Sequence, residues 1–183
     1  IAAYMTRFLR DDQGAFLAAQ DADVNAHDPS APFVDGHVYY ALDDAHRRAC
    51  GLPRVDPHVY ARENGLAIAS LAALYEVARD PDALDAARRA ADLLATTHVT
   101  PDAAVHHESH TDAAAVRHLL DAASLGWGHA RLAEVLPERD PAHARYVARA
   151  EQIARRMLVD FRDPAAGALF GQTEDPAAVG VFA

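Results

Sequence analysis

Two acidic side chains, Asp21 and Asp23, stand two positions apart just after a short apolar stretch. This spacing leaves two interpretations open, because the carboxylates can line the mouth of a pocket or can cap and turn the chain. The cluster recurs, since Gln20 and Asp23 return later as Gln172 and Asp175. We therefore treat Asp21 and Asp23 as candidate catalytic carboxylates and Gln20 as a candidate ligand-binding residue.

Glu63 and Asn64 open a long apolar run that begins at residue 65. An asparagine there can satisfy free backbone N–H groups at the start of a helix, which is a purely structural role. If the helix starts at the rim of a cavity, the glutamate can act as an acid or base once apolar neighbours raise its pKa. Glu63 is thus a candidate catalytic residue and Asn64 a candidate ligand-binding one.

Asp121 is an acid inside an otherwise apolar stretch, between Leu120 and Ala122. Burying a carboxylate costs free energy unless a partner or a wet cavity faces it. The sequence therefore predicts either an essential structural pair or a functional acid, and we keep Asp121 as the fourth catalytic candidate. Trp127, which stands between two glycines, can stack on a sugar ring or fill a core.

The run from His106 to His110 contains three histidines and a glutamate and suggests a metal site. A zinc-binding helix needs two residues between the glutamate and the following histidine, and here only one intervenes. We predict a polar loop, no metal and no other cofactor, with His106 or His107 available to a ligand. The single cysteine, Cys50, excludes an internal disulfide or a thioredoxin-type pair and suggests a reducing, cytoplasmic compartment.

Charge excludes some partners of this 183-residue chain. It has 17 basic and 27 acidic side chains, for a formal net charge of −10. Nucleic acids and anionic membranes attract clustered basic residues, so neither is expected to bind. No apolar run approaches the roughly 20 residues needed to span a bilayer. An apolar fraction of 51% is typical of a globular chain.

Helices are expected to position these side chains, because alanine and leucine alternate with charged residues over long stretches. Residues 64–75 are apolar on nearly every side, whereas 82–97 carry a single apolar stripe. The same couplet returns as a charge-poor helix capped by Thr111 or Asp112, followed by an amphipathic helix after Asp140. Two helical hairpins, 64–97 and 111–160, are predicted, with 18–62 as an irregular connection holding a strand and a short helix around 43–50.

Short non-helical segments repeat after the amphipathic helices. Residues 14–17 and 167–170 are alike in sequence, and 105–108 occupy the equivalent place in between. Buried helices that alternate with amphipathic ones are typical of two concentric rings. The sequence thus predicts a mainly all-α fold, an (α/α) toroid of helical hairpins with short β excursions, in which 1–183 form part of one domain. An α-solenoid or irregular bundle is the alternative.

Four stretches resemble, in order, motifs of the thioredoxin-domain-containing family of the spermatogenesis-associated protein 20 type: residues 14–23, 35–42, 64–69 and 120–123. The resemblance implies a toroid like those of six-hairpin glycosidases and N-acylglucosamine 2-epimerases, and it adds Tyr39 to the ligand-binding candidates. The family's toroid is longer, so an incomplete ring is expected. Its thioredoxin domain has no counterpart here, so no thiol-redox activity is expected.

These observations lead to a hypothesis about function. The leading hypothesis is that a central cavity binds a sugar-like small molecule. It implies epimerase- or glycosidase-like chemistry at most, and a role in carbohydrate metabolism. The alternative is a non-catalytic scaffold, or a truncated fragment without activity, because Glu63 and Ala122 depart from the family's Trp and Tyr. An incomplete ring would leave apolar helices uncovered, so self-association or a missing domain is also expected.

Overall fold

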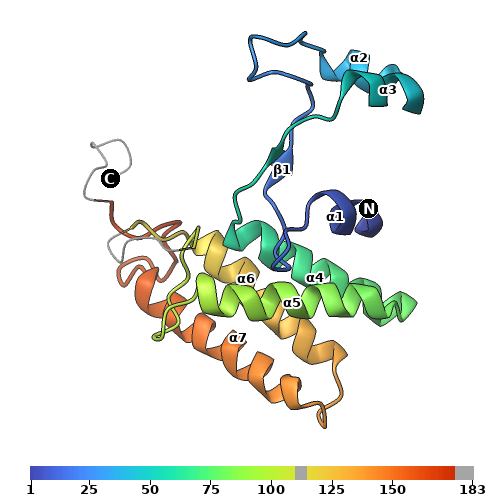
Figure 1. The fold of residues 1–183 in the computed structure, drawn as a ribbon. Coiled ribbons are helices and arrows are strands. Elements are labelled where there is room, and N and C mark those ends of the chain that lie inside the picture. Colours follow the sequence, from blue (N-terminus) through green and yellow to red (C-terminus); the bar gives the residue numbers. More distant parts are fainter. Residues whose placement is uncertain (110–114, 176–183) are drawn as a thin grey trace.

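The computed structural model describes residues 1–109 and 115–175. Helices make up 54% of them, and strands are few. The elements in chain order are α1 (Ala2–Phe8), β1 (Ala19–Gln20), α2 (Gly36–Ala41), α3 (Asp44–Cys50), β2 (Val55–Asp56), α4 (Ala61–Ala78), α5 (Pro81–Thr97), α6 (Leu119–Val135) and α7 (Pro141–Asp160) (Figure 1). The prediction of a mainly helical fold is confirmed. Within the described residues, no helix is long and apolar enough to cross a membrane.

The four long helices form two hairpins that share one core. Helix α4 packs along α6, α5 covers α4, and α7 covers α6 (Figure 1). The larger aliphatic side chains of this core are Ile68, Leu71, Leu94, Leu125, Leu132 and Ile153. Buried side chains on one face of α5, such as Leu94, and of α7, Tyr146 and Ile153, close the outer side of this core. Inner and outer helices therefore alternate, as the sequence pattern predicts.

Helices α4 and α6 approach each other so closely that their backbones touch. A Cβ atom on Gly65 would lie 2.3 Å from the carbonyl carbon of Ser124 and 2.5 Å from the nitrogen of Leu125. A Cβ atom on Gly128 would lie 2.9 Å from the carbonyl oxygen of Gly65. Only glycine leaves room for this contact, so the two residues set the distance between the inner helices.

Both outer helices begin at the Asp-Pro pairs of the sequence. Asp80 accepts hydrogen bonds from the backbone nitrogens of Asp82 and Ala83, and Asp140 accepts one from Ala142. Proline follows each aspartate at the first helical position, where no backbone N–H is needed.

A short β excursion follows each of α1, α5 and α7. Each excursion is closed by an isolated bridge: Arg10 with Phe16, Val99 with Val105, and Arg162 with Leu169. The last two excursions return to the inner helix of their own hairpin: Ala61 donates to the carbonyl of His107, and Leu119 donates to that of Gly171. These bonds hold the first residue of α4 and of α6. The predicted repeat of inner helix, outer helix and β excursion is thus present.

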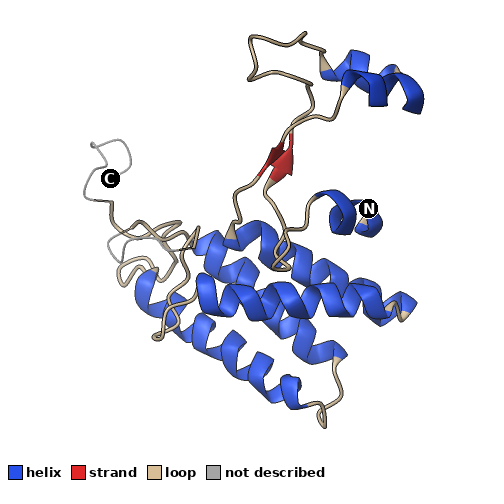
Figure 2. Cartoon of the chain, viewed as in Figure 1, coloured by secondary structure: helices blue, strands red, loops and turns tan. Residues whose placement is uncertain are grey.

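Residues 21–54, which we call the arm, extend away from the helical bundle (Figure 2). Strands β1 and β2 form the base of the arm, paired antiparallel with Ala19 opposite Asp56 and Gln20 opposite Val55. Helix α3 lies where a short helix was expected. Residues 36–41 are also helical, because Asp35 caps the backbone nitrogen of His37.

The second inner helix begins later than expected. Its first residue is Leu119, and His118 occupies the N-cap position without a side-chain cap. Thr111 and Asp112, the expected caps, lie outside the described residues. That the whole chain forms part of one toroid domain stays a prediction.

A buried histidine in α6 makes the stability of the fold depend on pH. Burial, and then the positive charges of Arg149 and Arg145, lower the pKa of His129 to about 4. In an unfolded chain a histidine has a pKa near 6.5. As the pH falls from about 6.5 to about 4, the unfolded chain therefore takes up the proton first, and stability falls.

We expect this single residue to remove about 3 kcal/mol from the free energy of unfolding across that window. His129→Leu should lose this part of the pH dependence while keeping the rest. Urea denaturation of both proteins at intervals between pH 7 and pH 4 measures the difference. Parallel curves for the two proteins would contradict the assignment.

Candidate functional site

The inner helices α4 and α6 begin at the same end of the bundle, next to the β excursion that follows α5 (Figure 1). The backbone nitrogen of Arg62 donates to Oδ1 of Asp121 at 3.1 Å, which links the two helix starts. Glu63 and Asp121 are each the third residue of their helix. Two of the predicted acids therefore occupy equivalent positions in the repeat. We call the side chains gathered at this end the rim site: His58, Tyr60, Glu63, His107, His118 and Asp121.

Asp121 is buried and lies within hydrogen-bonding distance of a partly exposed imidazole. Its side chain is 2% exposed, whereas that of His107 is 41% exposed. His107 Nδ1 lies 3.0 Å from Oδ2 and 3.2 Å from Oδ1 of Asp121. The imidazole thus connects a buried carboxylate to solvent. An arrangement of this kind can pass a proton between solvent and a bound molecule.

Flat rings are stacked beside this pair of side chains. Tyr60 stacks on His107 with ring centroids 4.2 Å apart, and on His58 with centroids 5.6 Å apart. His118 meets His107 edge to face at 5.7 Å. Nδ1 of His58 is held 2.5 Å from Oδ1 of Asp56. Rings ordered in this way offer apolar surface and polar edges together, which suits a ligand with both kinds of group.

Carboxylates surround the stack. Desolvation, followed by the negative charges of Asp56, Glu108 and Glu63, raises the pKa of Tyr60. Glu63 Oε2 is buried and has no hydrogen-bond partner among the residues described. A buried carboxylate oxygen without a partner is uncommon and is able to accept a hydrogen bond from a ligand. The first turn of a helix also favours a negative charge.

Asn64 has a structural role at the same end of α4. Its Oδ1 accepts from the nitrogen of Phe16 at 2.7 Å, and its Nδ2 donates to the carbonyls of Phe16 and Tyr60 at 2.8 and 2.9 Å. The side chain does not cap the helix, which begins at Ala61. Its hydrogen bonds to Phe16 attach the β excursion after α1 to α4. Ligand binding by Asn64 stays a prediction, and any ligand would have to share these polar atoms.

Four other predicted residues lie in the arm or at its base: Gln20, Asp21, Asp23 and Tyr39. Gln20 donates to the carbonyl of Pro53 at 3.0 Å, and the hydroxyl of Tyr4 donates to Gln20. Asp21 lies 3.4 Å from His27. Asp23 accepts from the nitrogen of Gly36 at 2.6 Å, and the Tyr39 hydroxyl donates to Gly51 at 3.0 Å. These contacts hold the arm together, and their predicted roles in catalysis and binding stay untested.

The remaining two candidates differ in exposure, since His106 is buried and Trp127 is half exposed. Burial, and then the positive charge of Arg117, lower the pKa of His106, whose side chain is buried. Trp127 is 51% exposed on α6.

The sequence did not single out His58, Tyr60 or His118. A signal was available, since Tyr60 and His118 each immediately precede an inner helix.

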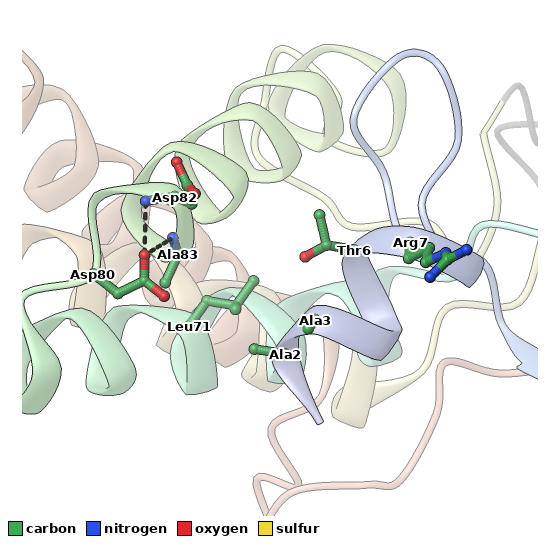
Figure 3. A pocket seen from close by; sticks show the side chains of 8 residues that line it. All are labelled: Ala2, Ala3, Thr6, Arg7, Leu71, Asp80, Asp82 and Ala83. Carbon is green, nitrogen blue, oxygen red and sulfur yellow. Dashed lines mark hydrogen bonds between the residues drawn. The ribbon is translucent and has the colours of Figure 1, made fainter.

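No group of three or more histidine, cysteine or acidic side chains within 1–109 and 115–175 is placed to hold a metal ion. A cavity of about 260 Å³ lies between α1 and the turn from α4 to α5 (Figure 3). Thr6, Arg7, Leu71 and Asp80 are among its lining residues, and no predicted site residue is. No rim-site residue lines this cavity either, so it is separate from the candidate site. The carboxylate of Asp80 caps α5.

Comparison with known proteins identifies the fold but no family. No protein-family model and no curated protein matches this chain, so the resemblance to the thioredoxin-domain-containing family gains no support. Solved structures do match. The unsaturated glucuronyl hydrolase of Bacillus sp. GL1, described as responsible for the degradation of glycosaminoglycan, has a TM-score of 0.67 at 17% identity and is aligned over 91% of this chain.

Two further structures agree. A UGL variant with dGlcA-Glc-Rha-Glc has a TM-score of 0.67 at 16% identity over 91% of this chain. Unsaturated glucuronyl hydrolase from Streptococcus agalactiae has a TM-score of 0.61 at 13% identity over 90%. The chain spans 39–40% of the length of these proteins. Its fold is therefore that of part of a six-hairpin helical toroid.

Proposed function

We propose that the rim site binds a saccharide, and that Asp121 and Glu63 act on it as the two carboxylates of a glycosidase-like reaction in carbohydrate metabolism. The observation that carries the proposal is the buried carboxylate of Asp121 paired with the solvent-reaching His107, beside the Tyr60 stack. The fold supports it, because the matching structures include an unsaturated glucuronyl hydrolase described as degrading glycosaminoglycan and a UGL variant whose description names dGlcA-Glc-Rha-Glc.

The chemistry of the rim site fits this reaction. Glycoside hydrolysis needs one group that donates a proton and a second carboxylate that activates water or attacks the sugar. The pair of His107 and Asp121 can hold and release a proton at the edge of the site. Glu63 brings a carboxylate oxygen that has no partner among the described residues. The rings of Tyr60 and His58 offer surface against which a pyranose can pack.

Asp121→Asn tests the proposal. An asparagine can still accept from the Arg62 nitrogen, so the fold should persist. The carboxylate that faces Nδ1 of His107 becomes a neutral amide, so the two side chains can no longer share a proton. Turnover of a reactive 4-nitrophenyl glycoside should therefore fall about 100-fold or more. Asp82→Asn, in the first turn of α5, is the matched control and should leave the rate unchanged.

Binding is measured separately, by calorimetry against a panel of mono- and oligosaccharides. Glu63→Gln should weaken the binding of any saccharide that the wild type retains. If no saccharide binds, or if Asp121→Asn turns over at the wild-type rate, the proposal is wrong.

A non-catalytic scaffold is the second candidate, and one observation favours it. Asn64 is fully used in structural hydrogen bonds, and Asp121 is also bonded within the chain. On this hypothesis, substitutions at the rim site change stability and no binding constant. Membership of the thioredoxin-domain-containing family also remains a hypothesis, which rests on residues 14–23, 35–42, 64–69 and 120–123 alone.

A further inference from the structure

A second cavity, of about 320 Å³, lies among helices α5, α6 and α7. Its polar lining comes from all three helices: Asp92, Thr96, His129, Arg145, Tyr146 and Arg149. None of these residues belongs to the rim site, and none was singled out by the sequence. The cavity therefore needs an explanation of its own.

His129 is the first indication of a ligand. The residue is 1% exposed, and neither ring nitrogen has a hydrogen-bond partner among the described residues. Burying a polar group without a partner is unfavourable, and most buried polar groups in proteins are hydrogen-bonded. A leucine would fill a similar volume without this penalty. The unsatisfied imidazole at this cavity thus points to a polar group that comes from outside the chain.

The charges around the cavity indicate which group that is. Asp92 is already neutralised, because Arg145 Nη2 donates to both of its oxygens at 3.0 and 3.1 Å and the Tyr146 hydroxyl donates at 3.1 Å. Arg149, in contrast, makes no ion pair or hydrogen bond within the part of the chain that the structure describes. The cavity therefore carries one uncompensated positive charge in a chain whose net charge is −10.

We propose that this cavity binds a small organic anion through its carboxylate or phosphate group, with Arg149 as the counter-ion and His129 as a hydrogen-bond donor. A guanidinium pairs well with either group because its N–H donors match two oxygens. A neutral imidazole supplies one N–H donor. The buried ring of Tyr146, whose centroid lies 5.7 Å from that of His129, offers an apolar wall for the body of the ligand.

Titrations followed by NMR test the proposal on the whole chain. Inorganic phosphate and benzoate are added separately, and the ring signals of His129 are followed, with benzyl alcohol as the uncharged counterpart of benzoate. We expect a saturable shift with one or both anions and none with benzyl alcohol. The anion that saturates at the lower concentration distinguishes a phosphate ligand from a carboxylate ligand.

Two variants of α7 make the test specific. Arg149→Met should weaken anion binding at least tenfold, because it removes the counter-ion without breaking an ion pair. Arg155→Met removes the same charge from an exposed position on the same helix and should bind the anions like the wild type. His129→Leu, followed through the ring signals of Tyr146, should also lose binding while its resistance to urea at pH 7 rises.

Two outcomes would overturn the proposal. One is that neither anion moves the His129 signals, in which case the cavity holds only water. The other is that Arg149→Met and Arg155→Met weaken binding equally, which would mean that the anions respond to the overall charge of α7. Because Arg149→Met removes no hydrogen bond or ion pair among the described residues, misfolding of the variant is not expected to obscure the result.

Discussion

Gly65→Ala is expected to destabilise the protein by about 3 kcal/mol or more, because the added methyl group has nowhere to go. The new Cβ atom would lie 2.3 and 2.5 Å from backbone atoms of Ser124 and Leu125. Backbone atoms cannot move aside as a flexible side chain can. The two inner helices would have to separate, and the core between them would open.

Urea denaturation measures the loss as a fall in the midpoint at unchanged slope. Gly171→Ala is the matched control, since a Cβ atom there meets nothing within 4 Å. It should leave the midpoint close to that of the wild type. If Gly65→Ala unfolds at the same urea concentration as Gly171→Ala, the close approach of α4 and α6 is not as described.

Asn64→Leu is expected to have an effect of similar size for a different reason. The substitution keeps the approximate volume of the side chain but removes three hydrogen bonds, which serve the nitrogen and carbonyl of Phe16 and the carbonyl of Tyr60. The nitrogen and carbonyl of Phe16 lose their partner, whereas the carbonyl of Tyr60 keeps its bond from the backbone nitrogen of residue 64. Each buried backbone group left without a partner costs about 1–3 kcal/mol. We therefore expect a total loss of about 3 kcal/mol or more in the free energy of unfolding.

The loss should be accompanied by loosening of the excursion after α1. Hydrogen exchange at the amide of Phe16 measures this directly, because its hydrogen bond to Asn64 would be gone. Gln152→Leu, which removes an amide from the exposed side of α7, should change neither the exchange rate nor the stability. Continued protection of the Phe16 amide in Asn64→Leu would show that another group holds this segment.

Local signals in the sequence predicted the helices well. The pairs Asp80-Pro81 and Asp140-Pro141 mark the starts of α5 and α7, because a cap and a proline act within one turn. The spacing of the apolar residues also distinguished inner from outer helices, because a buried helix is apolar on every side and an outer one on a single stripe. Helix α2 was missed, since residues 38–41 are apolar without a helical period and Asp35 is its one local signal.

The candidate site could be predicted only in part. Glu63 and Asp121 stood out because an acid beside or within an apolar run is costly to bury, and this is visible in one dimension. The rings that surround these two carboxylates could not be predicted from the sequence. His107 follows the next helix after Glu63, and Tyr60 lies about 60 positions before Asp121. The return of the excursion after α5 to the start of α4 brings His107 to Tyr60 and Glu63, and the packing of α6 against α4 adds His118 and Asp121.

The return of each β excursion to its own inner helix has a consequence for how the chain acquires this structure. Ala61 is bonded to His107, and Leu119 to Gly171, so each hairpin closes through contacts within about 50 residues of sequence. The contacts between the two helices of one hairpin are nearer in sequence than those between the hairpins, so less chain entropy is lost in forming them. We therefore expect either hairpin to begin folding independently of the other. The backbone contact at Gly65 then becomes the late step that joins two preformed halves.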